Sequence, residues 1–302
     1  MGKASRNKRD TAREKIAAQR AEAKRAERRR TLFITGGSIL VVVVIVIVFV
    51  IVKATGGGSP ASASSTSATG TALPASVVRN ITAVSPATLE GIGAGSATPK
   101  TVTPVTGGAP LTSSGKPELL YIGAEYCPYC ATERWAMAVA LSRFGTFSNL
   151  HGIHSSSSDV YPNTPTLTFY KSTYSSRFLT FTPVETTTEN RNTPLQQTTA
   201  AQQAVFKKYD NPPYVSSANA TAIPFVDFAN KYFVHGAQYS PTVLAGKTWS
   251  QVAAALNNKT SPIAQGADGA ANMMTAAICK MTSNQPSNVC SSPAITTLQG
   301  QL

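Results

Sequence analysis

The strongest constraint on the fold comes from a short apolar run that leads directly into a pair of cysteines. Residues 119–124 read Leu-Leu-Tyr-Ile-Gly-Ala, which has the length and composition of a buried strand. Cys-Pro-Tyr-Cys follows at residues 127–130, and residues 131–144 space their larger apolar side chains as a helix does. The sequence therefore predicts a strand, a CxxC motif at a helix start, and then the helix.

The two cysteines of this motif, Cys127 and Cys130, are the predicted chemical centre. At a helix N-terminus, unpaired N–H groups and the helix dipole stabilise a thiolate. Such settings lower a cysteine pKa from about 8.5 into the range of about 3.5–7.5. We therefore expect Cys127 to be the exposed attacking thiol and Cys130 to be the resolving thiol. Pro128 falls in the first helical turn, where its missing N–H costs nothing.

Neighbouring side chains are expected to modulate the reactivity of Cys127. Tyr129 offers a hydroxyl but no positive charge, so it should stabilise the thiolate less than a histidine would. Glu125 and Glu133 lie close in sequence and would raise the pKa of Cys127, whereas Arg134 would lower it. The sequence leaves the balance between these opposing charges open.

Two other roles for the motif remain open. It could form half of a zinc site, with nitrogen ligands from His151 and His154, but those two side chains would face opposite sides of a strand. It could also hold a purely structural disulfide, although so small a ring gains little loop entropy. We therefore favour redox chemistry and predict no metal site.

A second stretch, residues 223–228, reads Ile-Pro-Phe-Val-Asp-Phe and is predicted to form a strand. A turn at residues 230–231 and an antiparallel partner strand at residues 232–234 should follow. If Pro224 is cis, it would hold the backbone of Ile223 against the CxxC motif, where that backbone could receive a substrate strand. An ordinary edge-strand proline is the alternative.

The remaining cysteines, Cys279 and Cys290, flank a segment in which Asn-Gln-Pro suggests a turn. An even number of cysteines outside the cytoplasm favours pairing. We expect a structural disulfide that pins a C-terminal helix, with a second redox pair that relays electrons as the alternative.

Residues 32–52 contain no charged side chain, and residues 39–52 are apolar throughout. At a rise of ~1.5 Å per residue this segment would be about 31 Å long, which matches a hydrocarbon core of ~30 Å. The apolar region of a cleavable signal peptide usually has only about 7–15 residues. The segment is therefore predicted to be an uncleaved signal-anchor, a single transmembrane helix.

The positive charge of the chain is concentrated before this segment. Residues 1–30 hold twelve Lys or Arg against four Asp or Glu, a net of +8 out of +13 for the whole chain. Beside an apolar span, such a cluster favours lipid contact and membrane orientation over nucleic-acid binding. The positive-inside rule then puts the N-terminus in the cytoplasm and residues 54–302 outside.

The predicted organisation has four parts. Residues 1–31 form a basic cytoplasmic arm, residues 32–52 the transmembrane helix, and residues 53–75 a flexible linker rich in Gly, Ser, Ala and Thr. Residues 76–302 form the extracytoplasmic domain, with a core at about 118–290. Strands that alternate with helices, followed by a late hairpin, predict an α/β sandwich for this domain.

The motif and its surroundings resemble the thioredoxin superfamily. The string from Glu118 to Cys130, with Glu133-Arg134-Trp135, is similar to a membrane-anchored branch, domain of unknown function family 929. The resemblance covers about residues 118–290 and implies a thioredoxin-like fold, here with an insertion at about 155–222. It also implies that residues 223–236 are the cis-proline strand and its hairpin. The basic arm and anchor resemble those of membrane-bound disulfide oxidoreductases, whereas the central Pro-Tyr matches glutaredoxins, which are cytoplasmic reductants.

These features together predict a membrane-anchored extracytoplasmic thiol–disulfide oxidoreductase that oxidises or isomerises protein disulfides. Its expected partners are cysteine-containing extracytoplasmic proteins, membrane lipid and a membrane redox partner, and no separate cofactor is required. The alternative is a non-catalytic cell-surface binding module on a thioredoxin-like scaffold, with the 155–222 segment as its contact surface.

Overall fold

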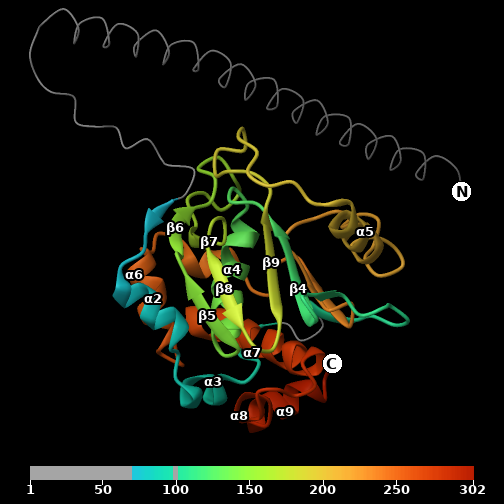
Figure 1. The fold of residues 1–302 in the computed structure, drawn as a ribbon. Coiled ribbons are helices and arrows are strands. Elements are labelled where there is room, and N and C mark those ends of the chain that lie inside the picture. The colour runs from blue at the N-terminus through green and yellow to red at the C-terminus, as the bar shows by residue number, and fades with distance from the viewer. Residues whose placement is uncertain (1–69, 98–100) are drawn as a thin grey trace, which may run out of the picture. The chain divides into compact units, whose positions relative to one another are not determined.

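The computed structural model describes residues 70–97 and 101–302, which form a mixed α/β fold of sheets and helices (Figure 1). Within these two ranges, no helix is both long enough and apolar enough to cross a membrane. The predicted transmembrane helix at 32–52 and the predicted basic arm at 1–31 lie outside the described residues.

The central sheet is built around β4 (Lys116–Gly123), the strand that the sequence predicted before the CxxC motif. On one side, β4 pairs in parallel with β9, and Leu120 lies opposite Thr182. On the other side, it pairs antiparallel with β10, and Tyr121 lies opposite Val226. The sheet continues through β11 to β2, and a short hairpin joins β3 to β4. These strands are β9 (Thr180–Glu185), β10 (Phe225–Phe228), β11 (Tyr232–His235), β2 (Val102–Pro104) and β3 (Thr112–Ser113).

Alternation along β4 divides the core between the two faces of this sheet, because successive side chains of a strand point in opposite directions. Leu119 and Tyr121 belong to the larger cluster, which contains α4 (Pro128–Ser142) and α7 (Pro262–Met281). Leu120 and Ile122 belong to a smaller cluster with Tyr209 of α5 (Ala200–Tyr209). Helices therefore cover both faces, with α4 and α7 on one and α5 on the other (Figure 1).

Two small sheets extend the layer beside α4. One contains β1 (Thr71–Ala72), β6 (His151–His154) and β7 (Pro165–Thr168), and the other pairs β5 (Gly145–Ser148) with β8 (Thr173–Ser176). The predicted end of the flexible linker at residue 75 is therefore wrong. Thr71 lies opposite Gly152 in an antiparallel ladder, so strand pairing already holds the chain at residue 71.

Each of the two main C-terminal helices begins directly after a residue whose side chain caps the helix N-terminus. The predicted helix at 249–256 matches α6 (Trp249–Leu256). The helix predicted at 270–280 is longer, because the Ser261 hydroxyl caps the first turn of α7 and Pro262 occupies its first position. Glycine interrupts the sequence pattern there for a packing reason: a Cβ on Gly269 would lie 2.2 Å from the carbonyl oxygen of Ala94.

Shorter helices complete the fold: α2 (Ala75–Thr82), α3 (Pro86–Ile92), the 3-10 helix η2 (Pro241–Leu244), α8 (Ser287–Cys290) and α9 (Pro293–Gln299). Cys279 at the end of α7 forms a disulfide bond with Cys290 of α8. The predicted pairing of these two cysteines is confirmed, and both are buried.

Candidate functional site

Cys127 lies immediately before α4 and caps its N-terminus. Its backbone is extended (φ −79°, ψ 119°), and its Sγ accepts a hydrogen bond of 3.2 Å from the backbone N–H of Cys130. Pro128 occupies the first helical position, as the sequence predicted. The sulfur therefore sits among the free N–H groups of the helix end, the setting that favours a thiolate.

Neither thiol is exposed, which corrects the expectation that Cys127 is open to solvent. Cys127 is 5% exposed and Cys130 is fully buried. Cys127 is covered because the backbone of a distant strand closes over it: its Sγ lies 3.7 Å from the carbonyl oxygen of Ile223. The Ile223–Pro224 peptide bond is cis, as the family resemblance implied, and β10 begins at the next residue.

The pKa values of the two thiols are shifted in opposite directions. The pKa of Cys127 is lowered, first by a hydrogen bond with the Cys130 thiol and then by the N–H of Cys130, the charge of Arg134 and the N–H of Tyr129, although burial opposes the shift. Burial raises the pKa of Cys130 well above its ordinary value, and the neighbouring Cys127 adds to this. An acidic first thiol and a protonated second thiol suit attack by Cys127 and later resolution by Cys130.

Tyr129 is the exposed member of the motif. The residue is 40% exposed, and its ring makes an edge contact with Tyr161, with the ring centroids 5.8 Å apart. Tyr161 belongs to the 155–222 segment, so this segment lies against the motif. The Tyr129 side chain supplies no charge toward Cys127, and Tyr129 contributes to the lowered pKa of Cys127 only through its backbone N–H, a smaller cause than the Cys130 thiol.

Glu125 is buried, and the Thr168 hydroxyl donates a hydrogen bond of 2.6 Å to its carboxyl group. Burial raises the pKa of Glu125 to about 7. Glu125 was predicted to raise the pKa of Cys127, but Arg134 is the charged side chain among the groups that most strongly set that pKa. With a pKa of about 7 the Glu125 carboxyl is only partly ionised near neutral pH, so it exerts less charge on the thiol than an ordinary glutamate does.

Arg134 and Glu185 form a fully buried ion pair behind the motif. The Arg134 guanidinium donates two hydrogen bonds of 2.7 Å to the Glu185 carboxylate and one of 2.6 Å to the carbonyl oxygen of Ala124. Arg134 was a candidate from the sequence because it lies close to the motif, whereas Glu185 is far from it in sequence and was not predicted. The available signal was weak: an acidic residue at the end of a strand that runs parallel to the strand before the cysteines.

The polar 155–222 segment encloses the residues just before Cys127. The backbone N–H of Ser156 donates to the carbonyl oxygen of Tyr126 at 2.9 Å. The backbone N–H of Glu125 donates to the carbonyl oxygen of Thr187, also at 2.9 Å. The guanidinium of Arg191 lies 4.5 Å from the centroid of the Tyr126 ring. Two separate loops of this segment are therefore fastened to the strand–helix junction.

The contacts of the three histidines are with residues outside the CxxC motif. His235 contacts Asp210 through its Nδ1, and the His154 ring lies 4.9 Å from the Trp249 ring. His151 contacts the carbonyl oxygen of Asn149 through its Nδ1. Across residues 70–97 and 101–302, no group of three or more His, Cys, Asp or Glu side chains is arranged to hold a metal ion.

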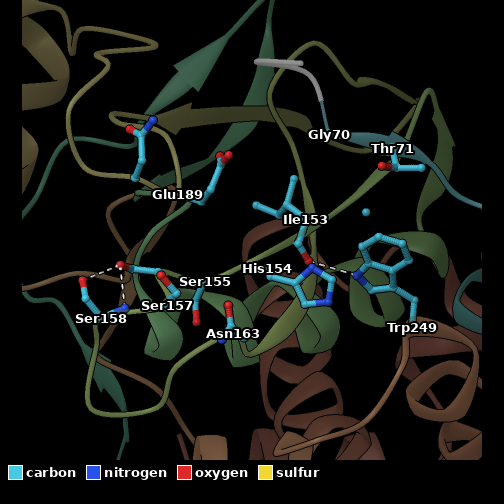
Figure 2. A pocket seen from close by; sticks show the side chains of 13 residues that line it. Gly70, Thr71, Ile153, His154, Ser155, Ser157, Ser158, Asn163, Glu189 and Trp249 are labelled. Carbon is cyan, nitrogen blue, oxygen red and sulfur yellow. Dashed lines mark hydrogen bonds between the residues drawn. The ribbon is translucent and has the colours of Figure 1, made fainter. Parts of the chain in front are cut away.

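A pocket of about 500 Å³ is lined by residues of the loops that bond to Glu125 and Tyr126 (Figure 2). The loop at 155–158 that bonds to Tyr126 forms one wall, and Trp249 of α6 forms another. Sequence reasoning did not predict this pocket, because its walls come from parts of the chain far apart in sequence. They are Gly70, Thr71, Gly152, Ile153, His154, Ser155, Ser156, Ser157, Ser158, Asn163, Glu189, Asn190 and Trp249.

Comparison with known proteins identifies one family. Residues 105–280 match the family model described as Domain of unknown function (DUF929). No curated protein and no solved structure matches the chain.

Proposed function

The chain belongs to the DUF929 family, and we propose that it is a thiol–disulfide oxidoreductase in which Cys127 and Cys130 are the reacting pair. One observation carries the proposal: the Cys127 sulfur caps a helix N-terminus with a lowered pKa, while Cys130, three residues later, keeps a raised one. This asymmetry is what disulfide exchange through a mixed disulfide requires.

We further propose that the scaffold is thioredoxin-like. Three features support this: the order β4, CxxC, α4; the cis Ile223–Pro224 bond with its carbonyl beside Cys127; and the antiparallel hairpin of β10 and β11. These features lie in the two segments that carried the resemblance at the level of the sequence, residues 118–135 and 223–236. In this proposal the backbone at Ile223 and Pro224 receives an extended segment of the substrate.

The exchange steps follow from the two thiols. In the oxidising direction, a substrate thiolate attacks Cys127 of the Cys127–Cys130 disulfide, and Cys130 leaves as a thiolate. A second substrate thiolate then attacks the substrate sulfur of the mixed disulfide, which releases Cys127 as a thiolate. Two electrons and two protons pass from the substrate dithiol to the cysteine pair. For isomerisation, the Cys127 thiolate instead attacks a substrate disulfide, and a substrate thiolate leaves and later displaces Cys127.

The proposed setting is the outer face of a membrane, with residues 32–52 as the anchor and the N-terminus in the cytoplasm. The Cys279–Cys290 disulfide supports this setting, because such bonds persist in oxidising compartments. There the pair acts on cysteine-containing proteins in the oxidising or isomerising direction. A membrane protein that carries a disulfide and passes electrons to quinone would then reoxidise it.

The deciding measurement is the reduction potential of the Cys127–Cys130 pair in the full chain. Protein equilibrated in thiol redox buffers is alkylated and its mass is measured. We expect a potential well above ~−300 mV with Cys127 alkylated first, and a value near ~−120 mV would mark an oxidase. A Cys127→Ser variant should lose exchange with a two-cysteine peptide, and a Cys130→Ser variant should accumulate the mixed disulfide. A Cys279→Ala/Cys290→Ala variant is the control and should keep full exchange.

A second candidate function is a non-catalytic binding module, which the burial of Cys127 favours because a covered thiol reacts slowly. The same experiment separates the two. A pair that stays oxidised below ~−300 mV, or a Cys127 that resists alkylation in the folded protein, would reject the enzyme and leave the binding module.

A further inference from the structure

The pocket walled by the 155–158 loop and Trp249 carries an unbalanced negative charge. Among the residues that line it, Glu189 is acidic, and none is lysine or arginine. Burial lowers the pKa of His154, so this imidazole is neutral at physiological pH. Residues 31–302 as a whole hold fifteen Lys or Arg against ten Asp or Glu, so the pocket differs in sign from the rest of this part of the chain.

Glu189 makes no ion pair within the described part of the chain, whose three such pairs involve other residues. Nearby Arg191 is already bound to Asp159. Glu189 also lies close enough to Glu125 to affect the pKa of Glu125. Burial is the main cause of that raised pKa, and the charges of Glu185 and Glu189 raise it further. A cation in the pocket would therefore balance the charge of the Glu189 carboxylate, which has no partner of opposite charge within the described residues.

Aromatic rings form the other side of the pocket. In Figure 2, the Trp249 indole and the Glu189 carboxylate stand on opposite sides of the view, with His154 between them. The Trp249 N–H donates to the carbonyl oxygen of Ile153 at 2.9 Å, which fixes the indole. Gly152 allows this position, because a Cβ there would lie 2.7 Å from the indole ring. A fixed indole attracts an ammonium or guanidinium group through its π electrons.

The pocket and the cysteine pair share their supporting loops. Ser156 lines the pocket and bonds to the carbonyl oxygen of Tyr126, one residue before Cys127. Thr187, two residues before Glu189, accepts from the backbone N–H of Glu125. A polypeptide held at Cys127 therefore has the pocket within reach of its neighbouring side chains.

We propose that this pocket binds a lysine or arginine side chain of the polypeptide whose cysteine reacts with Cys127. The identity of that polypeptide rests on the proposed function, whereas binding of the cationic side chain does not. A volume of about 500 Å³ lies within the usual range for ligand pockets and holds a long side chain with adjoining backbone. Anionic groups are excluded by the unpaired Glu189 carboxylate. A neutral saccharide would use the serine, asparagine and indole groups but would leave that charge unmatched.

The test uses two short peptides without cysteine that differ only by Lys or Gln at one position. Binding to the full chain is followed by NMR through the indole N–H signal of Trp249. Trp135 supplies an internal control, because it is fully buried and its indole N–H is bonded to Pro165. We expect the Lys peptide to shift the Trp249 signal with saturation, to leave Trp135 unchanged, and to bind about two- to fivefold more tightly than the Gln peptide.

A Glu189→Gln variant should remove the preference for Lys over Gln. Glu90→Gln is the matched control: it removes the same charge from an exposed site on α3 and should keep the preference. Equal binding of both peptides, or a Lys preference that survives Glu189→Gln, would overturn the inference. Saturating binding of a neutral disaccharide in place of the Lys peptide would overturn it as well.

A separate arm keeps this inference distinct from the proposed function. Cysteine-containing versions of the two peptides are tested for mixed disulfide formation with the Cys130→Ser variant. Binding of the Lys peptide without any disulfide exchange would reject the oxidoreductase and preserve the cationic pocket. Exchange at equal rates for Lys and Gln peptides would reject the pocket as a substrate site and preserve the oxidoreductase.

Discussion

Replacing Glu133 by glutamine should remove a defined part of the pH dependence of stability. Glu133 lies on α4, the helix of the CxxC motif, and is fully buried. Its Oε2 accepts a hydrogen bond of 3.1 Å from the backbone N–H of Gln238, while its Oε1 has no partner within the described residues. Burial raises its pKa from 4.5 to about 8. The carboxyl group therefore keeps its proton in the folded protein at neutral pH.

Proton linkage gives the direction in which stability changes with pH. Between about pH 4.5 and pH 8 the folded protein binds this proton more tightly than the unfolded chain does, so stability falls as the pH rises. The stabilising contribution is fully present below the unfolded pKa and is lost as the pH passes through the folded one. With about 1.36 kcal/mol for each pKa unit, the loss from Glu133 between about pH 5 and pH 8 is on the order of 3 kcal/mol.

The assay is urea unfolding of the full chain at pH 5 and pH 8, for the wild type and for Glu133→Gln. The glutamine carbonyl can still accept a hydrogen bond from Gln238, and the glutamine side chain never ionises. Between pH 5 and pH 8 the free energy of unfolding should therefore fall by about 3 kcal/mol less in the variant than in the wild type. Glu125, Asp227 and Asp268 also have pKa values raised by burial, but their contributions cancel in the comparison. Equal losses in both proteins would refute the reasoning.

Three further predictions concern the motif and its supports. Cys130→Ala should raise the pKa of Cys127, because the thiol hydrogen bond is its main stabiliser; an iodoacetamide rate profile that stays at the same pH would contradict this. Glu185→Gln should lower the free energy of unfolding, measured by chemical denaturation, by about 3–5 kcal/mol, because it leaves Arg134 buried and unpaired. The double variant Arg134→Met/Glu185→Leu should recover most of that free energy. If the double variant is the less stable one, the pair contributes more than its desolvation costs. The Cys279→Ala/Cys290→Ala variant should lose about 3 kcal/mol of unfolding free energy, and the alkylation rate of Cys127 should not change. A lower alkylation rate of Cys127 would instead show that the disulfide influences the CxxC pair.

Much of the local structure could be predicted from the sequence. The buried strand, the CxxC motif at the helix start and the late hairpin all occur where residue patterns indicated them. The position of Cys127 at the N-cap of α4 follows from its neighbours alone, since Pro128 begins the helix. The pairing of Cys279 with Cys290 could also be predicted, from their number and spacing.

The start of helix α7 could not be predicted from neighbouring residues alone. Its first two turns contain glycines, which lower intrinsic helix propensity, so the pattern predicted a later start. Gly266 is needed because a Cβ would lie 2.7 Å from the Tyr239 ring. The contact that explains this glycine joins residues far apart in the chain, and a window of adjacent residues cannot contain it.

The sequence by itself determined the CxxC motif and its helix, because the N-terminal position of the first cysteine depends on backbone geometry within one turn. Only the tertiary structure decided how the pair is surrounded. It covers Cys127 with the Ile223 carbonyl, joins Arg134 to Glu185, and brings Glu189 and Trp249 to one pocket. Burial and charge pairing depend on segments that meet only after folding. The burial of Cys127, the raised pKa of Glu125 and the pocket are therefore properties of the packed domain.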